Sequence, residues 1–259
     1  MEVTFYKYHG AGNDFILFDN RSGTFQLDSE AIARLCDRRF GIGADGLMTL
    51  DLSSSHDFHL NYYNADGSLG SLCGNGSRCG VALAFRLQMI KEKTSFTAAD
   101  GEHSAEIDPT TQQVALSMGD VYEINPHKDY IFIDTGSPHH IRWVKDLNQV
   151  DVAQEGKRLR YEVHGTAGAN VNFVEQKSEN TFAIRTYERG VEAETLACGT
   201  GAVAAAIAMH YSHKTTASSI EMQALGGLLK IDFTPINSGY TQIVLTGPAQ
   251  FVFKGNLEL

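Results

Sequence analysis

Apolar and polar residues alternate over many short stretches of this chain, which is the period-2 pattern of half-buried β-strands. Residues 58–63, Phe-His-Leu-Asn-Tyr-Tyr, are one example. Asp100-Gly101 and Gly226-Gly227 each separate two apolar stretches, and such dipeptides favour hairpins because they accept positive φ. The pattern predicts strands at 3–6, 15–18, 58–63, 94–99, 102–107, 112–118, 130–134, 139–144, 170–176, 180–187, 218–224, 228–234, 241–246 and 250–253.

Helical periodicity is rarer. Asp28 is placed to cap a helix that runs through Arg39, because the apolar residues that follow it fall on one helical face. Further helices are predicted over 76–91 and 201–213. Strands joined by tight turns, with few helices, indicate the α+β class with mainly antiparallel pairing.

The tetrapeptide Cys-Gly-x-Gly occurs twice, at 73–76 and at 198–201. Each copy directly precedes the most apolar helix of its half of the chain. This repetition predicts a duplicated fold with a boundary near residues 120–125.

The chain has 259 residues and a formal net charge of −10, with 42% hydrophobic residues. That length suits two domains or two lobes, and the composition is that of a globular protein. The acidic balance disfavours a nucleic-acid partner or an anionic membrane surface, because both need clustered Lys and Arg. No stretch resembles a signal peptide or a membrane span, so we expect a cytoplasmic protein with reduced thiols.

A cysteine at a helix N-terminus faces unpaired backbone N–H groups and the positive end of the helix dipole. Both favour the thiolate, and flanking glycines let backbone amides approach a carboxylate closely. Two such turns could hold one amino acid by its α-carboxylate with a sulfur on each side of Cα. One thiolate would then remove the α-proton while the other thiol delivers a proton to the opposite face.

Burial as a small apolar residue is the usual fate of a free cysteine, and we expect it for Cys36 and Cys79. The matched sequence contexts make that interpretation less favourable for Cys73 and Cys198. Zinc is not expected, because the six-residue spacing of Cys73 and Cys79 exceeds the usual gap between ligands.

The chain closely resembles the diaminopimelate epimerase family. The resemblance lies in the segments YHGAGNDF (8–15), RRFGIGADG (38–46), YYNADGSLGSLCGNGSRCG (62–80), GSPHH (136–140), ANVNFV (169–174) and YERGVEAETLACGTGAVA (187–204). It implies epimerisation of LL-diaminopimelate to the meso isomer for lysine and peptidoglycan synthesis, without pyridoxal phosphate, metal or any other cofactor. A homodimer is the family expectation.

The same resemblance implies two pseudo-symmetric lobes, each an antiparallel barrel-like sheet around a central helix. We expect residues 1–122 to form the lobe with Cys73, and residues 123–249 to form the lobe with Cys198. The last strand, about 250–259, is expected to return to the first lobe.

By resemblance, Cys73 and Cys198 are the two catalytic bases. Glu188 and His139 match residues that tune the thiol pKa values, since a carboxylate would raise such a pKa and a protonated histidine would lower it. Glu188 and Arg189 also match a substrate-binding pair, and Arg189 could form a bidentate contact with the distal carboxylate. The remaining matched substrate-binding residues are Asn13, Asn64, Gly74, Asn75, Asn170, Gly199 and Thr200.

Asn13 and Asn64 also fit simple turn residues, and His139 fits a structural one. Two positions depart from the family pattern. Gly46 stands where many members have a substrate-contacting Gln, and Ser137 stands where many have Asn. We expect a water or a neighbouring residue to replace the missing amide at position 46.

Three other functions remain open at this point. The chain could racemise another amino acid such as proline or hydroxyproline, although Asn75 and the Glu188-Arg189 pair disfavour this. It could bind an amino acid without catalysis, through the glycine-rich turns alone. It could also be a thiol redox sensor whose two reactive cysteines form a disulfide.

Overall fold

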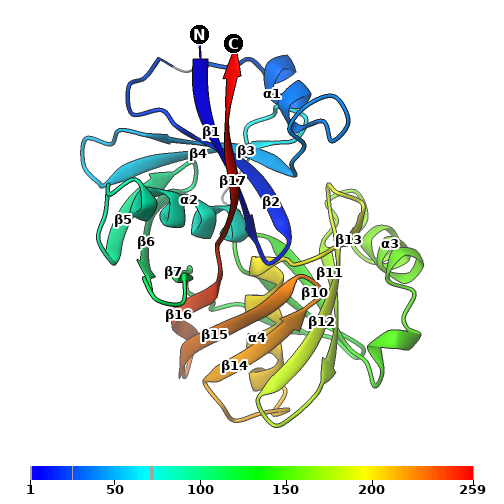
Figure 1. Ribbon diagram of the computed structural model, residues 1–259. Coiled ribbons are helices and arrows are strands. Elements are labelled where there is room, and N and C mark those ends of the chain that lie inside the picture. The colour runs from blue at the N-terminus through cyan, green and yellow to red at the C-terminus, as the bar shows by residue number, and fades with distance from the viewer. Residues whose placement is uncertain (1, 25, 71–72, 259) are drawn as a thin grey trace. The chain divides into compact units, whose positions relative to one another are not determined.

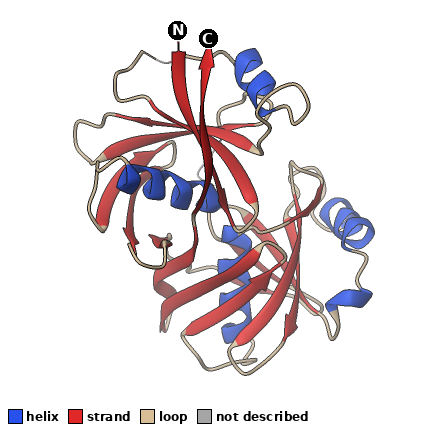
Figure 2. Cartoon of the chain, viewed as in Figure 1, coloured by secondary structure: helices blue, strands red, loops and turns tan. Residues whose placement is uncertain are grey.

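A computed structural model describes residues 2–24, 26–70 and 73–258 (Figure 1). The chain divides into two compact units. Unit 1 comprises Met1–Leu116 and Gly247–Leu259, and unit 2 comprises Ser117–Thr246. The boundaries expected from the sequence, after residues 122 and 249, lie a few residues further along the chain. Strands dominate both units (Figure 2).

Unit 1 is built on one curved run of paired strands in the order β17–β1–β2–β3–β4–β5–β6–β7. The C-terminal strand β17 pairs with β1, so the two ends of the chain belong to the same unit (Figure 1). Its elements are β1 (Glu2–Gly10), β2 (Asn13–Asp19), α1 (Ser29–Cys36), β3 (Gly46–Asp51), β4 (Phe58–Asn64), α2 (Gly74–Arg86), β5 (Lys93–Ala98), β6 (Gly101–Ile107), β7 (Gln113–Ser117) and β17 (Gln250–Glu258).

Unit 2 contains the strand run β8–β9–β10–β11–β12–β14–β15–β16, with the short β13 paired to β12. Its elements are β8 (Ile124–Pro126), β9 (Ile131–Asp134), β10 (Pro138–Trp143), the 3₁₀ helix η1 (Leu147–Gln149), α3 (Val152–Glu162), β11 (Asn170–Gln176), β12 (Thr181–Glu188), β13 (Ala193–Thr195), α4 (Gly199–Tyr211), β14 (Ser219–Ala224), β15 (Gly227–Ile236) and β16 (Gly239–Pro248).

The two runs repeat the same pairing pattern from one edge to the other. In each, two antiparallel pairs are followed by a parallel, an antiparallel and a parallel pair, and then by two antiparallel pairs. The helices repeat as well. Helix α2 lies between β4 and β5, and α4 lies between β13 and β14, so each leads into the last strand of the second parallel pair. The predicted α+β fold of two pseudo-symmetric lobes is therefore confirmed, with mostly antiparallel but mixed sheets.

A central helix packs inside each unit. In α2 every residue from Gly74 to Ala84 is buried, and in α4 nearly all residues from Gly199 to Met209 are buried. Helix α4 is apolar on nearly all sides and must therefore be enclosed, and its alanines let the surrounding strands approach closely. Helix α2 is enclosed although it carries polar residues. Among the described residues, no helix is both long and apolar enough to cross a membrane.

The helix boundaries differ from those expected. Both central helices begin two residues earlier, so that Cys73 and Cys198 are themselves the N-cap residues. Glycine is tolerated there because the first turn has few intrahelical hydrogen bonds to lose. Helix α1 ends at Cys36 rather than Arg39, although Asp28 caps it as expected, accepting a 2.8 Å hydrogen bond from the Ala31 amide.

Five of the described elements were not predicted, namely α3, β3, β8, β13 and the short η1. Strand β3 is buried on both faces, so it has no alternation of polar and apolar residues to detect. The other four are short or polar, and their positions depend on the neighbours against which they pack.

Candidate active site

Cys73 is half-buried at the start of α2, and its extended backbone makes it the N-cap. Its carbonyl accepts the first helical hydrogen bond, from the Ser77 amide at 2.7 Å, and its side chain does not cap the helix. The amides of Gly74 and Asn75 belong to the first turn of the helix, whose N–H groups point out of its N-terminal end. Together with the helix dipole, they form a site that favours an anion.

Two asparagines connect the Cys73 turn to the β1–β2 hairpin. The Cys73 Sγ lies 3.7 Å from Asn13 Oδ1, which also accepts a hydrogen bond from Asn75 Nδ2 at 3.2 Å. Asn13 follows the positive-φ residues Ala11 and Gly12, whose turn ends β1 and begins β2. The turn thus presents Asn13 to the sulfur.

An ionic network fixes the other end of the Asn13 amide. Its Nδ2 donates to Asp45 Oδ2 at 2.7 Å, so Oδ1 is the atom that faces Cys73. Arg38 bridges Asp45 and Asp14, with 2.6 Å contacts to each. Although burial raises the pKa of Asp14, hydrogen bonds from Arg38 and Lys7 outweigh it and lower that pKa to about 2. Asp14 is therefore charged at neutral pH.

Arg78 is a fully buried cation near the same turn. Its guanidinium donates to neutral groups, at 2.8 Å to Asn75 Oδ1 and at 3.2 Å to the Gly74 carbonyl. No described carboxylate forms an ion pair with it. Burial lowers the pKa of Arg78, while the thiols of Cys79 and Cys73 act in the opposite direction. A thiolate beside this guanidinium would be favoured by its charge.

Cys79 shares this neighbour but not the exposure of Cys73. It is fully buried, and burial raises the pKa of its thiol far more than Arg78 lowers it. Burial also raises the pKa of Cys36 to about 11. Both cysteines therefore remain neutral packing residues, as expected from the sequence.

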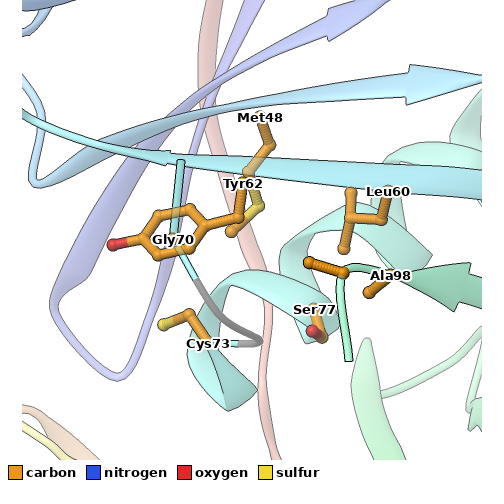
Figure 3. Close-up of a pocket in the computed structure, with 8 residues that line it drawn as sticks. Met48, Leu60, Tyr62, Gly70, Cys73, Ser77 and Ala98 are labelled. Carbon is orange, nitrogen blue, oxygen red and sulfur yellow. The ribbon is translucent and has the colours of Figure 1, made fainter. Parts of the chain in front are cut away.

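A small pocket opens beside Cys73, as Figure 3 shows. It is lined mainly by apolar side chains of the sheet, and Tyr62 and Cys73 both belong to the lining. The lining residues are Met48, Leu60, Tyr62, Gly70, Cys73, Ser77, Ala98 and Ala99. Sequence reasoning missed Tyr62, since an aromatic residue in an alternating strand is first read as core.

Asn64 lies at the end of β4, directly opposite Gly46 in β3. Its Nδ2 donates to Ser68 Oγ at 3.1 Å, and its backbone closes the turn that follows. Asn64 thus does act as a turn residue. Its side-chain nitrogen would be 3.5 Å from a Cβ added to Gly70, which lines the Cys73 pocket.

Cys198 repeats the geometry of Cys73 in unit 2. It is half-buried, is the N-cap of α4, and its carbonyl accepts from the Ala202 amide at 2.9 Å. Its first turn supplies the Gly199 and Thr200 amides. The Thr200 hydroxyl lies 3.5 Å from the Cys198 sulfur.

A directed chain of hydrogen bonds reaches Cys198. Asn172 Nδ2 donates to His139 Nδ1 at 3.1 Å, so His139 Nε2 carries the proton and donates to Thr200 Oγ1 at 3.0 Å. The Thr200 hydroxyl proton can then point to the sulfur. Burial, with a smaller contribution from Arg189, lowers the pKa of His139 to about 3. His139 is therefore neutral, and it does not act on Cys198 as the protonated histidine considered from the sequence.

The remaining predicted residues of unit 2 surround the start of β11. Asn170 donates to Ser137 Oγ at 2.9 Å and accepts from the Arg189 amide at 2.8 Å. The Ser137 hydroxyl is thus hydrogen-bonded to the start of β11. The Arg189 side chain is exposed and donates to the Ala167 carbonyl at 3.0 Å. Glu188 accepts a short hydrogen bond from Thr195.

The structure groups the predicted residues unit by unit. Asn13, Asn64, Gly74 and Asn75 lie around Cys73 or its pocket, and His139 and Thr200 are linked to Cys198. Arg78 and Asn172 were missed. Both are polar residues on otherwise buried element faces, which is the signal that could have identified them. Among the described residues, no group of three or more His, Cys, Asp or Glu could hold a metal ion.

Comparison with known proteins gives a consistent result. The family model described as diaminopimelate epimerase matches residues 5–124 and 131–252. The diaminopimelate epimerase of Flavobacterium psychrophilum is 51% identical over 96% of this chain and 98% of its own length. That of Chlorobaculum tepidum is 41% identical over 96% of this chain and 99% of its own.

Solved structures share the fold at low identity. A Bacillus anthracis phenazine biosynthesis protein of the PhzF family has a TM-score of 0.79 at 14% identity, with both chains fully covered. A hydroxyproline epimerase from Agrobacterium vitis has a TM-score of 0.73 at 14% identity and covers all of this chain and 93% of its own. The family match and the curated relatives extend over nearly the whole chain, and the chain therefore belongs to the diaminopimelate epimerase family.

Proposed function

We propose that this chain epimerises LL-2,6-diaminopimelate to meso-diaminopimelate, with Cys73 and Cys198 as the two acid–base groups. The observation that carries the proposal is the pair of half-buried cysteines, each the N-cap of a topologically matched buried helix. Membership of the family supplies the substrate. An isomerase of this kind belongs to amino-acid biosynthesis, here the supply of lysine and peptidoglycan precursors.

The first step is proton removal from the α-carbon. One sulfur begins as thiolate and takes the α-proton, so that the electron pair of the C–H bond passes to the α-carbon and its carboxylate. The amides of a helix first turn bind that carboxylate and stabilise the added negative charge. The second sulfur, still a thiol, then delivers its proton to the opposite face.

The protein ends each turnover with the charge on the other sulfur, so both sulfurs must reach one α-carbon and should titrate as a coupled pair. Arg78 favours the thiolate at Cys73 through its buried charge. The neutral His139–Thr200 chain offers Cys198 only a hydrogen bond. We therefore assign the resting thiolate to Cys73.

The second amino and carboxylate groups of diaminopimelate would be bound by residues that have polar atoms to offer. Asn13, Asn64, Asn170, Glu188 and Arg189 are the proposed partners. Arg189 is the exposed cation of this set, which suits a bidentate contact with the distal carboxylate.

The test is incubation of the reduced protein with LL-diaminopimelate in D₂O, followed by NMR. We expect deuterium at the α-carbon and formation of the meso isomer. Cys73→Ala and Cys198→Ala should each abolish epimerisation, while Cys36→Ala is the matched control at a packing cysteine and should retain it. Full activity in either of the first two variants would contradict the two-base mechanism.

The same experiment separates the alternatives. A binding protein would hold diaminopimelate without α-exchange. A racemase for another substrate would instead exchange the α-proton of trans-4-hydroxy-L-proline or proline. A redox sensor would form a Cys73–Cys198 disulfide as its function, whereas here oxidation should only inactivate, and dithiothreitol should restore epimerase activity.

The quaternary state and location are part of this proposal. We propose a cytoplasmic homodimer that uses the apolar surface of β17. Phe251, Val252 and Phe253 are all at least about a third exposed there, which is unusual for three consecutive apolar residues. Sedimentation analysis should give twice the chain mass of 28.3 kDa, and Val252→Asp should shift the protein to the monomer.

A further inference from the structure

The ring of Tyr62 lies between two glycines. A Cβ atom added to Gly46 would be 2.6 Å from Tyr62 Cε2, and one added to Gly70 would be 2.5 Å from Cδ1 and 2.6 Å from Cε1. Neither glycine has a positive φ. Their lack of a side chain is therefore needed for space rather than for backbone conformation. The Tyr62 ring occupies that space at both positions, and at Gly46 the Tyr63 carbonyl oxygen also lies 2.6 Å from the added Cβ.

The Tyr62 hydroxyl is close to the place that a side chain at position 46 would occupy. A Cβ on Gly46 would lie 3.3 Å from this oxygen. Strand register explains the proximity, because Gly46 pairs with Asn64 and Met48 pairs with Tyr62 in the β3–β4 ladder. Position 46 is where many members of the family carry a glutamine that contacts substrate.

The same ring belongs to the Cys73 pocket. Tyr62 and Cys73 both line it, and Figure 3 shows the hydroxyl and the sulfur on the same side of the view. Phe15 holds the ring edge-on, with a centroid distance of 6.1 Å. The orientation of the hydroxyl is thus set by packing on the faces and edges of the ring.

We propose that Tyr62 is a substrate-positioning residue of this chain, whose hydroxyl replaces the amide missing at Gly46. The inference rests on the proposed function and names a contact within that site. A phenol hydroxyl both donates and accepts, as an amide side chain does, so it can bind an ammonium or a carboxylate group of diaminopimelate. The Tyr62 side chain then depends on Gly46 and Gly70, because only glycines at these positions leave room for the ring.

Tyr62→Phe tests the hydroxyl without disturbing the packing of the ring. The KM for LL-diaminopimelate should rise about tenfold, the usual cost of a lost hydrogen bond to a charged group, while kcat changes much less. Tyr63→Phe is the matched control, because the neighbouring side chain points to the other face of β4 and lines a different cavity. Its KM should be unchanged. A Tyr62→Phe enzyme with unchanged KM, or with a loss confined to kcat, overturns the inference.

A second pair of variants tests the exchange of space. Gly70→Ala alone should lower kcat/KM strongly, because the new Cβ would lie 2.5 Å from the ring and displace it. In a Tyr62→Leu background, Gly70→Ala should cause little further loss, since the ring that it displaces is absent. An equal loss in both backgrounds contradicts the inference. Absence of α-exchange in the wild-type protein would instead contradict the proposed function itself.

Discussion

The two cysteine turns share a backbone and differ in what surrounds the sulfur. Cys73 and Cys198 are both N-caps of buried helices in topologically equivalent positions. Five residues further on, α2 carries the buried Arg78 where α4 carries the buried Val203. Near Cys198 the buried polar group is instead His139, which stays neutral.

This difference separates two properties of the site, namely the binding of an anion and the choice of the sulfur that is charged. Helix N-termini favour an anion in both units, and so would suit a carboxylate equally well on either side. A full buried charge acts more strongly than a hydrogen bond from a neutral hydroxyl, so it can decide which sulfur is charged at rest. The duplicated fold supplies the site, and single side chains set its polarity.

The largest effect should come from Arg78→Met. Without the buried cation, alkylation of Cys73 by iodoacetamide at pH 7 should slow roughly tenfold or more, with the midpoint of its pH profile shifted upward. Measured in a Cys198→Ala background, Arg78→Lys should recover most of the rate. Cys36 and Cys79 should stay unmodified by mass spectrometry, which reports that unit 1 is folded. An unchanged pH profile of Cys73 alkylation in Arg78→Met would show that Arg78 does not favour the thiolate at Cys73.

Mild acid should destabilise unit 2. Burial lowers the pKa values of His139 and His140 to about 3, so the unfolded chain binds two protons between pH 7 and 5 that the folded chain does not. Stability is therefore complete above pH 6.5 and is lost as the pH falls, by about 2 kcal/mol per histidine at pH 5.

Urea unfolding followed by fluorescence checks this, because the single tryptophan, Trp143, lies on the same strand as both histidines. His140→Gln should remove part of the pH dependence, and the rest comes from His139 and from His164 and His210, whose pKa values burial also lowers. In unit 1, Asp14 has a lowered pKa of about 2, so its contribution is present above pH 3.8 and is lost only as the pH falls toward 2. Equal acid sensitivity of His140→Gln and wild type would contradict the assignment.

Thr200→Val should affect Cys198 alone. Loss of the hydroxyl removes the last member of the Asn172–His139–Thr200 chain, and the rate of Cys198 alkylation in a Cys73→Ala background should fall several-fold. Thr200→Ser keeps the hydroxyl and should retain the rate. If Cys198 is alkylated as fast in Thr200→Val as in Thr200→Ser, the chain of hydrogen bonds does not act on the sulfur.

The smallest effect is expected from Asp45→Asn in unit 1. The neutral amide holds Asn13 less firmly, so the Asn13 side chain can rotate away from Cys73, and kcat/KM should fall a few-fold. Asp108→Asn is the control at an exposed turn carboxylate of the same unit, and it should leave kcat/KM unchanged. A loss as large as that of a cysteine variant would place Asp45 in the reaction itself.

Much of this architecture follows from local signals. The hairpins at Asp100-Gly101 and Gly226-Gly227 and the cap at Asp28 were predicted because their chemistry acts over a few residues. Strand β3 was missed because both of its faces are buried, so its sequence has no period to detect. The start of α2 was placed too late because the glycines of its first turn were read as loop.

The sequence by itself determined the α+β class, the duplication, the two candidate bases and the cysteines that only pack. These depend on periodicity, repetition and residue type, which can be read directly from the sequence. Only the tertiary structure decided that Arg78 is a buried cation beside Cys73, that His139 is neutral, and that Tyr62 lies between Gly46 and Gly70. Burial and contact across strands come from residues far apart in the chain, and they alone fix charge and space at the site.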